Sequence, residues 1–379
     1  MVGTLTPQWD RSEDRAQDLL LLDSLPGVGP AGVQRLARSF GGAAQARRAR
    51  FRDFAAIAGA DAARARARRD LADQVDRALA QAHELDMSVV TWGSTWYPDE
   101  LLHLADPPPL LFLRGRIELL ALRPAVTIVG SRRVTTRGRD VSRTLGRKLA
   151  EAGSVVVSGL ALGTDGQAHR GALEAGGDTI AVLGAGADVS YPRTHTRLHQ
   201  VMAERGLLVT EFAPGTKAAP YHFPRRNRVL AALGVDAVVV VEAGERSGSL
   251  ITVDHALDLG RDVWAVPGPI DGSACAGSNR LLADGARALV SIGDFVGTVV
   301  EPMRGESHAS SCAKPVEDRP TGTSSEELVL RSLSNDALPA SEVAVLCGQS
   351  VSDVLAALTT LELSGRVVRL PGLRYRRAA

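Results

Sequence analysis

The chain has 379 residues, which is too long for one ordinary domain and predicts two or three domains, at least one of them with a sizeable core. Its 44 Lys and Arg residues against 43 Asp and Glu residues give a net charge of +1, which excludes a strongly basic protein that coats nucleic acid through charge alone. Only three of the 44 basic residues are lysines. A GC-rich genome explains such an excess of arginine, so only local arginine clusters count as evidence of function.

The three cysteines, Cys275, Cys312 and Cys347, lie far apart without a CxxC spacing, which argues against a disulfide scaffold or a metal site. The first fifteen residues lack a basic stretch followed by an apolar one, and no segment approaches the roughly 18 apolar residues that span a bilayer. We therefore expect a soluble, cytoplasmic protein with no membrane partner, no metal and no cofactor.

Residues 1–86 predict an N-terminal helical domain, because this region is rich in Ala, Leu and Arg with apolar residues at helical spacing. Within it, residues 25–40 place Gly27 and Gly29 in a turn before an amphipathic helix, as in SAM-like and helix-hairpin-helix domains. Turn amides at a helix N-terminus can hold a DNA phosphate. A hairpin that serves only for packing is the alternative.

Residues 87–296 predict an α/β domain with a Rossmann-like parallel sheet, because short apolar runs alternate with helical patterns. The eight runs are 89–92, 110–113, 126–130, 155–160, 179–186, 207–212, 237–244 and 263–268. Residues 297–323 are rich in Ser, Pro, Gly and charge and have few large apolar residues, which predicts a linker.

Residues 324–379 predict a winged-helix domain of three helices followed by a hairpin. A Ser/Thr cap and an acidic first turn begin the first helix. The later helices carry few cations, which favours contact with protein over reading of a DNA groove, although both remain open.

Two of the predicted strands end in glycine turns that suit an anion. Gly130, Ser131, Arg132 and Arg133 open an arginine-rich helix, where backbone amides and guanidinium groups can hold phosphate. In the segment 158–165, Gly159 has no side chain and lets the backbone of this turn come close to a ligand. His169 follows one turn after Asp165, but no nucleophile accompanies the pair, so a helix cap with a packed histidine is favoured over acid/base catalysis.

The turn at 184–186 contains GxG but no complete GxGxxG and no fitting acidic residue, which excludes a dinucleotide site. The segment Phe223-Pro224-Arg225-Arg226-Asn227-Arg228 is more informative, because Lys217, Tyr221 and His222 lie just upstream. Cations beside aromatic rings are typical of single-stranded nucleic acid binding. An intramolecular ion-pair network is the alternative.

A fifth turn, Ser247-Gly248-Ser249, follows another apolar strand and opens a helix with free amides. Since the carboxyl ends of parallel strands share one edge of a sheet, we expect all these turns to converge on one anion-binding surface.

Together these motifs resemble the DprA/Smf family of DNA-processing proteins. The resemblance covers residues 92–294 in order, through the segments VGSRR, SGLALGTDGQAHRGAL, TIAVLGAGADVSYPRTHTRL, HFPRRNRVLAAL and AGERSGSLITVDHALDLGRDVWAVPG. It implies a non-enzymatic protein that binds single-stranded DNA during natural transformation, protects it and loads the RecA recombinase onto it. It also implies a homodimer paired through the Rossmann-like core, in the cytoplasm.

The resemblance further implies which residues form a DNA pocket. The family's GSR arginine and FPxRNR segment correspond to Arg132 and to Arg226, Asn227 and Arg228, and its Ser-Gly-Ser turn corresponds to residues 247–249.

Two segments depart from the family pattern. Leu162 replaces the usual arginine of the SGxARGID turn, in which Thr164 also replaces the usual isoleucine, and Pro220 stands where a basic residue often precedes FPxRNR. We hypothesise that Lys217 or Arg225 supplies the missing charge.

The rival hypothesis is a nucleotide-binding enzyme of the phosphoribohydrolase type on the same core. Such enzymes need a carboxylate near a phosphorylated ribose, for which Glu211 and Glu242 are the candidates. The segment SGSLITVDHA lacks a PGGxGT-type loop with a downstream glutamate, so we expect no catalytic residue.

Overall fold

The structure is a computed structural model that describes residues 14–300 and, in the C-terminal part, residues 329–330, 332–333, 338–339, 343, 346–347, 354, 357–358, 360–361, 366–370 and 374–377. The chain divides into two compact units, residues 1–311 and 312–379. Within the described ranges no helix has the length and apolar character that crossing a membrane requires.

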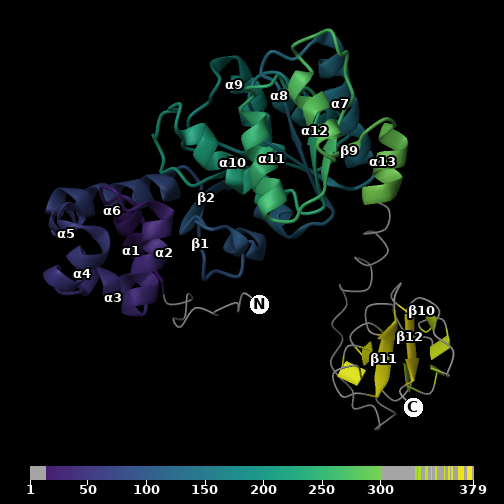
Figure 1. The fold of residues 1–379 in the computed structure, drawn as a ribbon. Coiled ribbons are helices and arrows are strands. Elements are labelled where there is room, and N and C mark those ends of the chain that lie inside the picture. Colours follow the sequence, from purple (N-terminus) through teal and green to yellow (C-terminus); the bar gives the residue numbers. More distant parts are fainter. Residues whose placement is uncertain are drawn as a thin grey trace, which may run out of the picture. The chain divides into compact units, whose positions relative to one another are not determined.

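The first unit begins with a group of six helices, which Figure 1 shows in purple and blue. They are α1 (Ala16–Asp23), α2 (Gly29–Phe40), α3 (Ala43–Arg48), α4 (Phe51–Ala58), α5 (Ala60–Arg66) and α6 (Arg69–Glu84). Gly27 and Gly29 adopt φ of +73° and +56°, which lets the chain turn between α1 and α2. The apolar face of α2 buries Val33 and Leu36, so the predicted turn and amphipathic helix are confirmed.

A nine-stranded sheet follows, and seven of its strands, β3 to β9, are parallel. In spatial order the strands are β1 (Ser88–Thr91), β2 (Leu110–Gly115), β6 (Leu207–Thr210), β5 (Thr179–Val182), β4 (Val155–Ser158), β3 (Ala125–Val129), β7 (Ala237–Val240), β8 (Val263–Ala265) and β9 (Arg287–Ala288). All eight apolar runs form strands, as predicted. The two-residue strand β9 was not predicted, because it has no apolar run.

The strands β1 and β2 are antiparallel to their neighbours, which differs from the wholly parallel sheet expected from the sequence. A parallel pair needs a long crossover connection, usually a helix. Only a short 3₁₀ helix, η2 (Asp99–His103), lies between β1 and β2, and η3 (Ile117–Ala121) follows β2.

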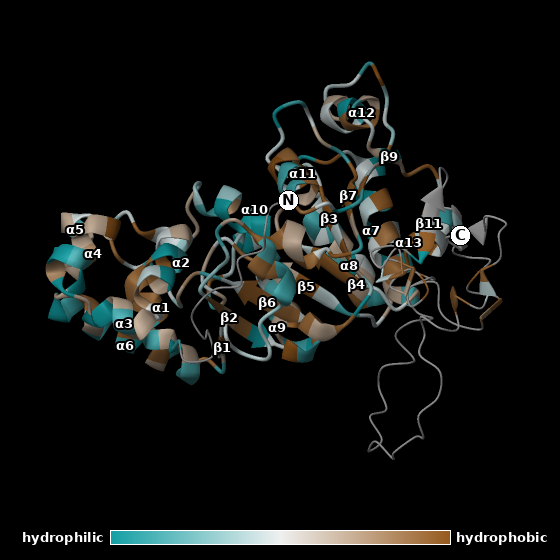
Figure 2. Cartoon of the chain, turned by 60° about the horizontal axis from the view of Figure 1, so that its bottom comes forward, coloured by the Kyte–Doolittle hydropathy of each residue, from teal (hydrophilic) through white to brown (hydrophobic). Residues whose placement is uncertain are grey.

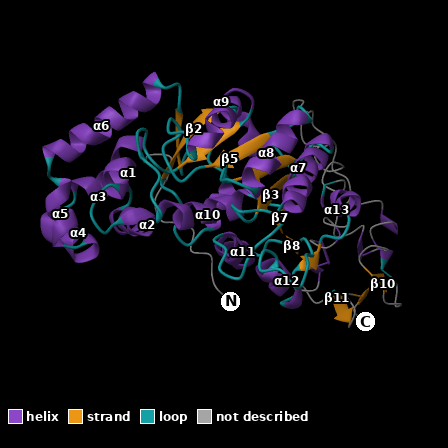
Figure 3. Cartoon of the chain, turned by 90° about the horizontal axis from the view of Figure 1, so that it is seen from above, coloured by secondary structure: helices purple, strands orange, loops and turns teal. Residues whose placement is uncertain are grey.

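Helices cover both faces of the sheet, as Figure 3 shows from above. The helices of this unit are α7 (Thr136–Glu151), α8 (Thr164–Glu174), α9 (Thr196–Arg205), which follows η4 (Arg193–His195), α10 (His222–Leu233), α11 (Ser249–Asp258), α12 (Ala276–Ala283) and α13 (Ile292–Val299). α7, α8 and α13 share one hydrophobic core with the sheet, and α10 and α11 belong to the core on the other face. The helix α13 includes residues 297–299, the first three residues of the predicted linker; residues 301–323 lie outside the described ranges.

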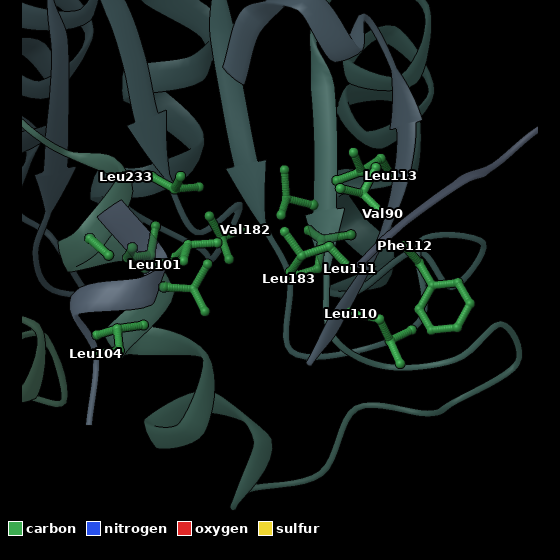
Figure 4. Close-up of a cluster of buried hydrophobic side chains, with 14 of the residues drawn as sticks. Val90, Leu101, Leu104, Leu110, Leu111, Phe112, Leu113, Val182, Leu183 and Leu233 are labelled. Carbon is green, nitrogen blue, oxygen red and sulfur yellow. The ribbon is translucent and has the colours of Figure 1, made fainter. Parts of the chain in front are cut away.

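Burial on both faces explains why the strands are apolar throughout, as the colouring of Figure 2 also displays. Val239 of β7 packs in the core under α7, and its neighbours Val238 and Val240 pack in the core under α10. Figure 4 shows part of the latter core, where Leu101 of η2 and Leu104, which directly follows η2, lie near Leu233 of α10.

The second unit contains a three-stranded antiparallel sheet in the order β10 (Leu338–Pro339), β12 (Arg374–Arg377), β11 (Val367–Leu370). β11 pairs with β12 in the predicted C-terminal hairpin, which is thereby confirmed. Its core includes Val329, Leu358 and Tyr375. The bounds of the three predicted helices lie outside the described residues.

Candidate functional site

The strand order creates a crevice between β3 and β7. From β3 the chain proceeds to β4, β5 and β6 on one side, whereas β7 leads to β8 and β9 on the other. In open parallel sheets such a switch point, at the carboxyl ends of the strands, is the usual place for a ligand. A cavity of about 360 Å³ lies there, which we call the switch-point cavity; its lining is Val129, Gly130, Ser131, Arg132, Arg133, Ala161, Asp165, Phe223, Pro224, Arg226, Asn227, Leu230, Ser247, Gly248, Ser249, Ile251 and Thr252.

Three of the turns converge as predicted, because residues 130–133, residues 247–249 and the side chains of Phe223, Pro224, Arg226 and Asn227 line this cavity; the turn at 184–186 does not line it. Sequence reasoning did not select Ile251, Thr252 or Leu230, which also line it. Their residue types carry no sequence signal for a binding site. Ile251 and Thr252 reach the cavity because they lie in the first turn of α11, and Leu230 because it lies on the side of α10 that faces the cavity.

The side chain of Arg226 is almost completely buried at the cavity, with 4% exposure. Its guanidinium donates to the carbonyl oxygen of Gly159 at 2.8 Å and to that of Val182. Burial lowers the pKa of Arg226 to about 10, and the nearby charge of Arg132 adds to this effect. The group therefore remains charged at neutral pH and ties α10 to the ends of β4 and β5.

Gly159 does not line the cavity but makes room for Arg226. A Cβ atom on Gly159 would lie 2.4 Å from Nη1 of Arg226 and 2.7 Å from its Cζ. Only a glycine allows the guanidinium to reach the carbonyl group of this residue in the observed position.

Asp165 lines the cavity at the start of α8. Its Oδ2 accepts from the backbone amides of Gly159 at 3.2 Å and Ala161 at 3.4 Å. Burial raises the pKa of this carboxyl, while the charge of Arg226 and the two amides oppose the rise. This side chain thus holds the turn before α8. It does not cap α8 as predicted, because the N-cap residue is Gly163 and no side chain caps the helix.

Asn227 joins the second and third segments of the site. Its Nδ2 donates to the carbonyl oxygen of Gly248 at 3.0 Å. The hydroxyls of Ser247 and Ser249 lie 2.7 Å apart and share one hydrogen bond. Together these contacts fix the loop that opens α11 against α10.

Arg132 differs from Arg226 because it is exposed, and no ion pair to it exists among the residues the structure describes. Its Cζ lies 4.6 Å from the centre of the Phe223 ring, which also packs against Tyr191 at a centroid distance of 5.5 Å. Tyr191 was missed in the sequence, although an aromatic residue followed by arginine after a glycine turn is a usable signal.

Arg225 and Arg228 do not line the cavity and instead form an ion-pair cluster. Arg225 contacts Glu211 at 2.9 Å and Asp23 of α1 at 3.2 Å. Arg228 contacts Glu211 at 2.7 Å and Asp106 at 3.0 Å. For these two arginines the structure has the intramolecular network that was the alternative, and any contact of theirs with DNA stays a prediction.

Burial raises the pKa of both Glu211 and Asp23, against the opposing charges of the arginines. The exposed Lys217, the other proposed substitute for the charge missing at Pro220, does not line the cavity. Leu162, at the other departure, is 42% exposed and also lies outside the lining.

The other two titratable side chains that the sequence singled out, Glu242 and His169, are hydrogen-bonded within the protein. Glu242 accepts from the backbone amide of Thr135 at 2.9 Å and from its hydroxyl at 2.6 Å, at the N-terminus of α7. His169 is fully buried, and its Nδ1 lies 2.7 Å from Oγ1 of Thr179. Burial lowers the pKa of His169 to about 3, so it is a neutral packed histidine, as predicted. Across the described ranges no cluster of His, Cys, Asp or Glu could hold a metal ion.

The chain matches two family models. Residues 88–299 match the model described as DNA recombination-mediator protein A, and residues 313–372 match that of the DprA winged helix domain. The second match agrees with the predicted winged helix.

Curated relatives share much of the chain. Protein Smf of Escherichia coli is 35% identical over 308 residues, which are 80% of this chain and 82% of that protein. The DNA processing protein DprA of Bacillus subtilis is 38% identical over 222 residues, which are 59% of this chain and 74% of that protein.

Two solved structures extend the similarity and lead to the family assignment. DNA processing protein A of Streptococcus pneumoniae superposes with a TM-score of 0.64 at 33% identity, over 75% of this chain and 98% of that one. The protein from Helicobacter pylori, described for its single-stranded DNA binding mode, superposes with a TM-score of 0.52 at 30% identity, over 57% of this chain and 98% of that one. With the described fold and these matches, the chain belongs to the DprA/Smf family of proteins of DNA processing and recombination.

Proposed function

We propose that this protein binds single-stranded DNA in the switch-point cavity, protects incoming strands during natural transformation and loads RecA onto them. It acts in the cytoplasm as a homodimer paired through the Rossmann-like core. Family membership supports this proposal, as does the single-stranded DNA binding described for the Helicobacter pylori protein.

The observation that carries the proposal is the pairing of Arg132 with Phe223 at the cavity. The exposed guanidinium lies over the ring at 4.6 Å and has no carboxylate partner in the described part of the chain. An unneutralised cation beside an aromatic face offers a phosphate contact and a stacking surface together, as single-stranded DNA requires. Gly130, Ser131 and Ser247 to Ser249 add backbone and hydroxyl donors.

A binding role is favoured over a phosphoribohydrolase-type reaction by the positions of the two candidate glutamates. Glu211 is buried between Arg225 and Arg228, and Glu242 accepts two hydrogen bonds from Thr135, the N-cap residue of α7. Neither lines the cavity. A general base must lie within hydrogen-bond reach of the group it deprotonates, and these carboxylates are already committed to other partners.

Titration of single- and double-stranded oligonucleotides tests the proposal. Arg132→Ala and Phe223→Ala should each weaken single-strand binding about tenfold, since one charge-assisted hydrogen bond or one stacked base is lost. Arg147→Ala removes one charge from the far end of α7, where Arg147 pairs with Glu151, and should bind as the wild type does.

Unchanged single-strand affinity in both cavity variants would remove the basis of the proposal. An assay for base release from nucleoside monophosphates should show no product, and release of base that depends on Glu211 or Glu242 would favour the enzyme instead.

A further inference from the structure

A second hollow of about 380 Å³ lies beyond the switch-point cavity, at the carboxyl ends of β8 and β9. Its lining is mostly apolar and consists of Arg137, Val141, Val266, Pro267, Leu289, Val290 and Ile292. We call it the β8–β9 groove. Val290 is 80% exposed, whereas Leu289 beside it is buried, so the groove has a fixed floor and an open apolar rim. Figure 1 shows the elements that form it, α7, β9 and α13, side by side.

The groove continues the edge of the sheet on which the switch-point cavity lies. A small hollow at the end of β7 adjoins the groove and shares Arg137, Val141, Val266 and Pro267 with it. The cavity is lined by α10 and α11, which lie on the other face of the sheet from α7 and α13. Neighbouring strands are about 4.8 Å apart, so β9 ends roughly 10 Å from β7. About three nucleotides span this distance even at the spacing of a duplex strand.

In the described part of the protein, three cations without an ion-pair partner lie on the chain near the cavity and the groove. Arg133 lines the cavity, Arg137 lines the groove, and Arg139 follows on α7; all three are exposed and have no ion-pair partner among the described residues. Farther along α7 the cations Arg143, Arg147 and Lys148 are paired with Glu174 or Glu151. Along α7, positive charge is thus left unneutralised near the start of the helix and not near its end. The helix dipole is also unfavourable to cations at that start.

From this arrangement we infer that the β8–β9 groove is a second subsite for the same single strand of DNA. Arg137 holds a phosphate, and the aliphatic rim around Val290 covers the face of a base. The inference rests on the proposed function of the switch-point cavity and extends it, since a cavity of about 360 Å³ holds little more than one nucleotide. The unpaired Arg133 at the cavity and Arg137 at the groove, four residues apart around the start of α7, favour DNA over a protein segment as the occupant.

Fluorescence anisotropy with oligothymidylates of stepwise increasing length tests this subsite. In the wild type, affinity should rise a second time when the strand becomes long enough to reach the groove. Arg137→Ala and Val290→Asp should abolish that second rise, which weakens binding of the longer strands about tenfold and leaves the shortest strands unaffected.

Two matched variants control for the loss of a positive charge and for the gain of a carboxylate elsewhere on the protein. Arg147→Ala removes a charge from the same helix, and Leu122→Asp places a carboxylate at an exposed apolar residue near the amino end of β3. Both should retain the length dependence. Arg132→Ala should weaken strands of every length, so loss of the cavity and loss of the groove give different patterns.

Two results would overturn the inference. Unchanged binding of all lengths by Arg137→Ala and Val290→Asp would mean that the groove serves another occupant, such as a protein segment. Equal weakening of the shortest and longest strands would mean that these residues do not form a separate subsite. If Arg132→Ala has no effect while the second rise depends on Val290, the cavity assignment fails and the groove assignment stands.

Discussion

Burial decides the role of each arginine in the FPRRNR segment. Arg226 and Arg228 are both nearly inaccessible, but Arg226 donates to backbone carbonyls at the cavity and Arg228 pairs with carboxylates. A buried guanidinium that keeps its charge needs such partners, because its desolvation is costly. Arg226 therefore contributes to the site chiefly by holding the strand ends in place and by adding positive potential to the cavity.

The close approach of the Arg226 guanidinium to Gly159 gives a testable prediction for a single residue. Gly159→Ala places a methyl group within 2.4 Å of the Arg226 guanidinium, which must then leave the carbonyl of residue 159. We expect a loss of about 1–3 kcal/mol in the free energy of unfolding, as for other overpacked sites. Single-strand affinity should also fall, because the segment 223–227 shifts with Arg226. Thermal unfolding and oligonucleotide titration measure the two effects.

Gly272→Ala is the matched control, because a Cβ at Gly272 meets no atom within 4 Å and its φ is not positive. It should leave stability and binding close to those of the wild type. Wild-type behaviour of Gly159→Ala would show that the guanidinium relocates without consequence, and Arg226 would lose its positioning role.

At the scale of elements, the ion-pair cluster connects α1 to α10. Arg225, whose side chain is 30% exposed, is the residue of this cluster that forms the ion pair with Asp23 in the described part of the chain. Glu211 is 2% exposed and depends on Arg225 and Arg228 for its partners. The cluster thus couples the N-terminal helices to the helix that bears Arg226.

Arg225→Ala should therefore act on stability more than on DNA binding. Loss of one partner of the buried Glu211 carboxylate should lower the free energy of unfolding by about 3 kcal/mol. In a double-mutant cycle, Arg225→Ala with Asp23→Ala should cost less than the two single changes added together, because the pair is in contact. Thermal or denaturant unfolding of the four proteins measures this coupling.

Measurements of DNA affinity decide whether Arg225 or Lys217 supplies the basic charge that is missing at Pro220. Lys217→Ala removes an exposed cation without a partner among the described residues and should leave stability unchanged. If Arg225→Ala weakens single-strand binding as much as Arg132→Ala while stability is retained, Arg225 is a DNA contact and the coupling role is wrong.

The sequence predicted these elements well and their side-chain partners poorly. The apolar runs of β2 to β8 are buried on both faces of the sheet, so their composition alone indicates strands. Glycine turns at the carboxyl ends of parallel strands must share an edge. The ion pair of Arg225 with Asp23 joins residues 202 positions apart in different parts of the fold. No local pattern records such a contact. The FPRRNR segment therefore suggested five DNA-binding residues, which the structure divides between a cavity and an ion-pair cluster.

For the whole molecule, a net charge of +1 means that long-range attraction of DNA is weak. The cations that matter are instead gathered at one edge of the sheet, as Arg132 and Arg133 at the cavity demonstrate. Two other arginines near this edge, Arg225 and Arg228, are neutralised by carboxylates. Binding should accordingly depend on a few local phosphate contacts.

The salt dependence of binding tests this view of the molecule. For short single strands each neutralised phosphate contributes about 0.7 to the slope of log K against log salt. Contacts from Arg132, Arg133 and the charge of Arg226 predict a slope of roughly −2, and Arg132→Ala should make it shallower by about 0.7. Arg147→Ala should keep the wild-type slope, because Arg147 lies at the paired end of α7. A much steeper slope, unaffected by Arg132→Ala, would mean that DNA is held by a broad basic surface elsewhere on the protein. An unchanged affinity across salt concentrations would mean that phosphate contacts contribute little, so that stacking on Phe223 would have to supply the binding energy.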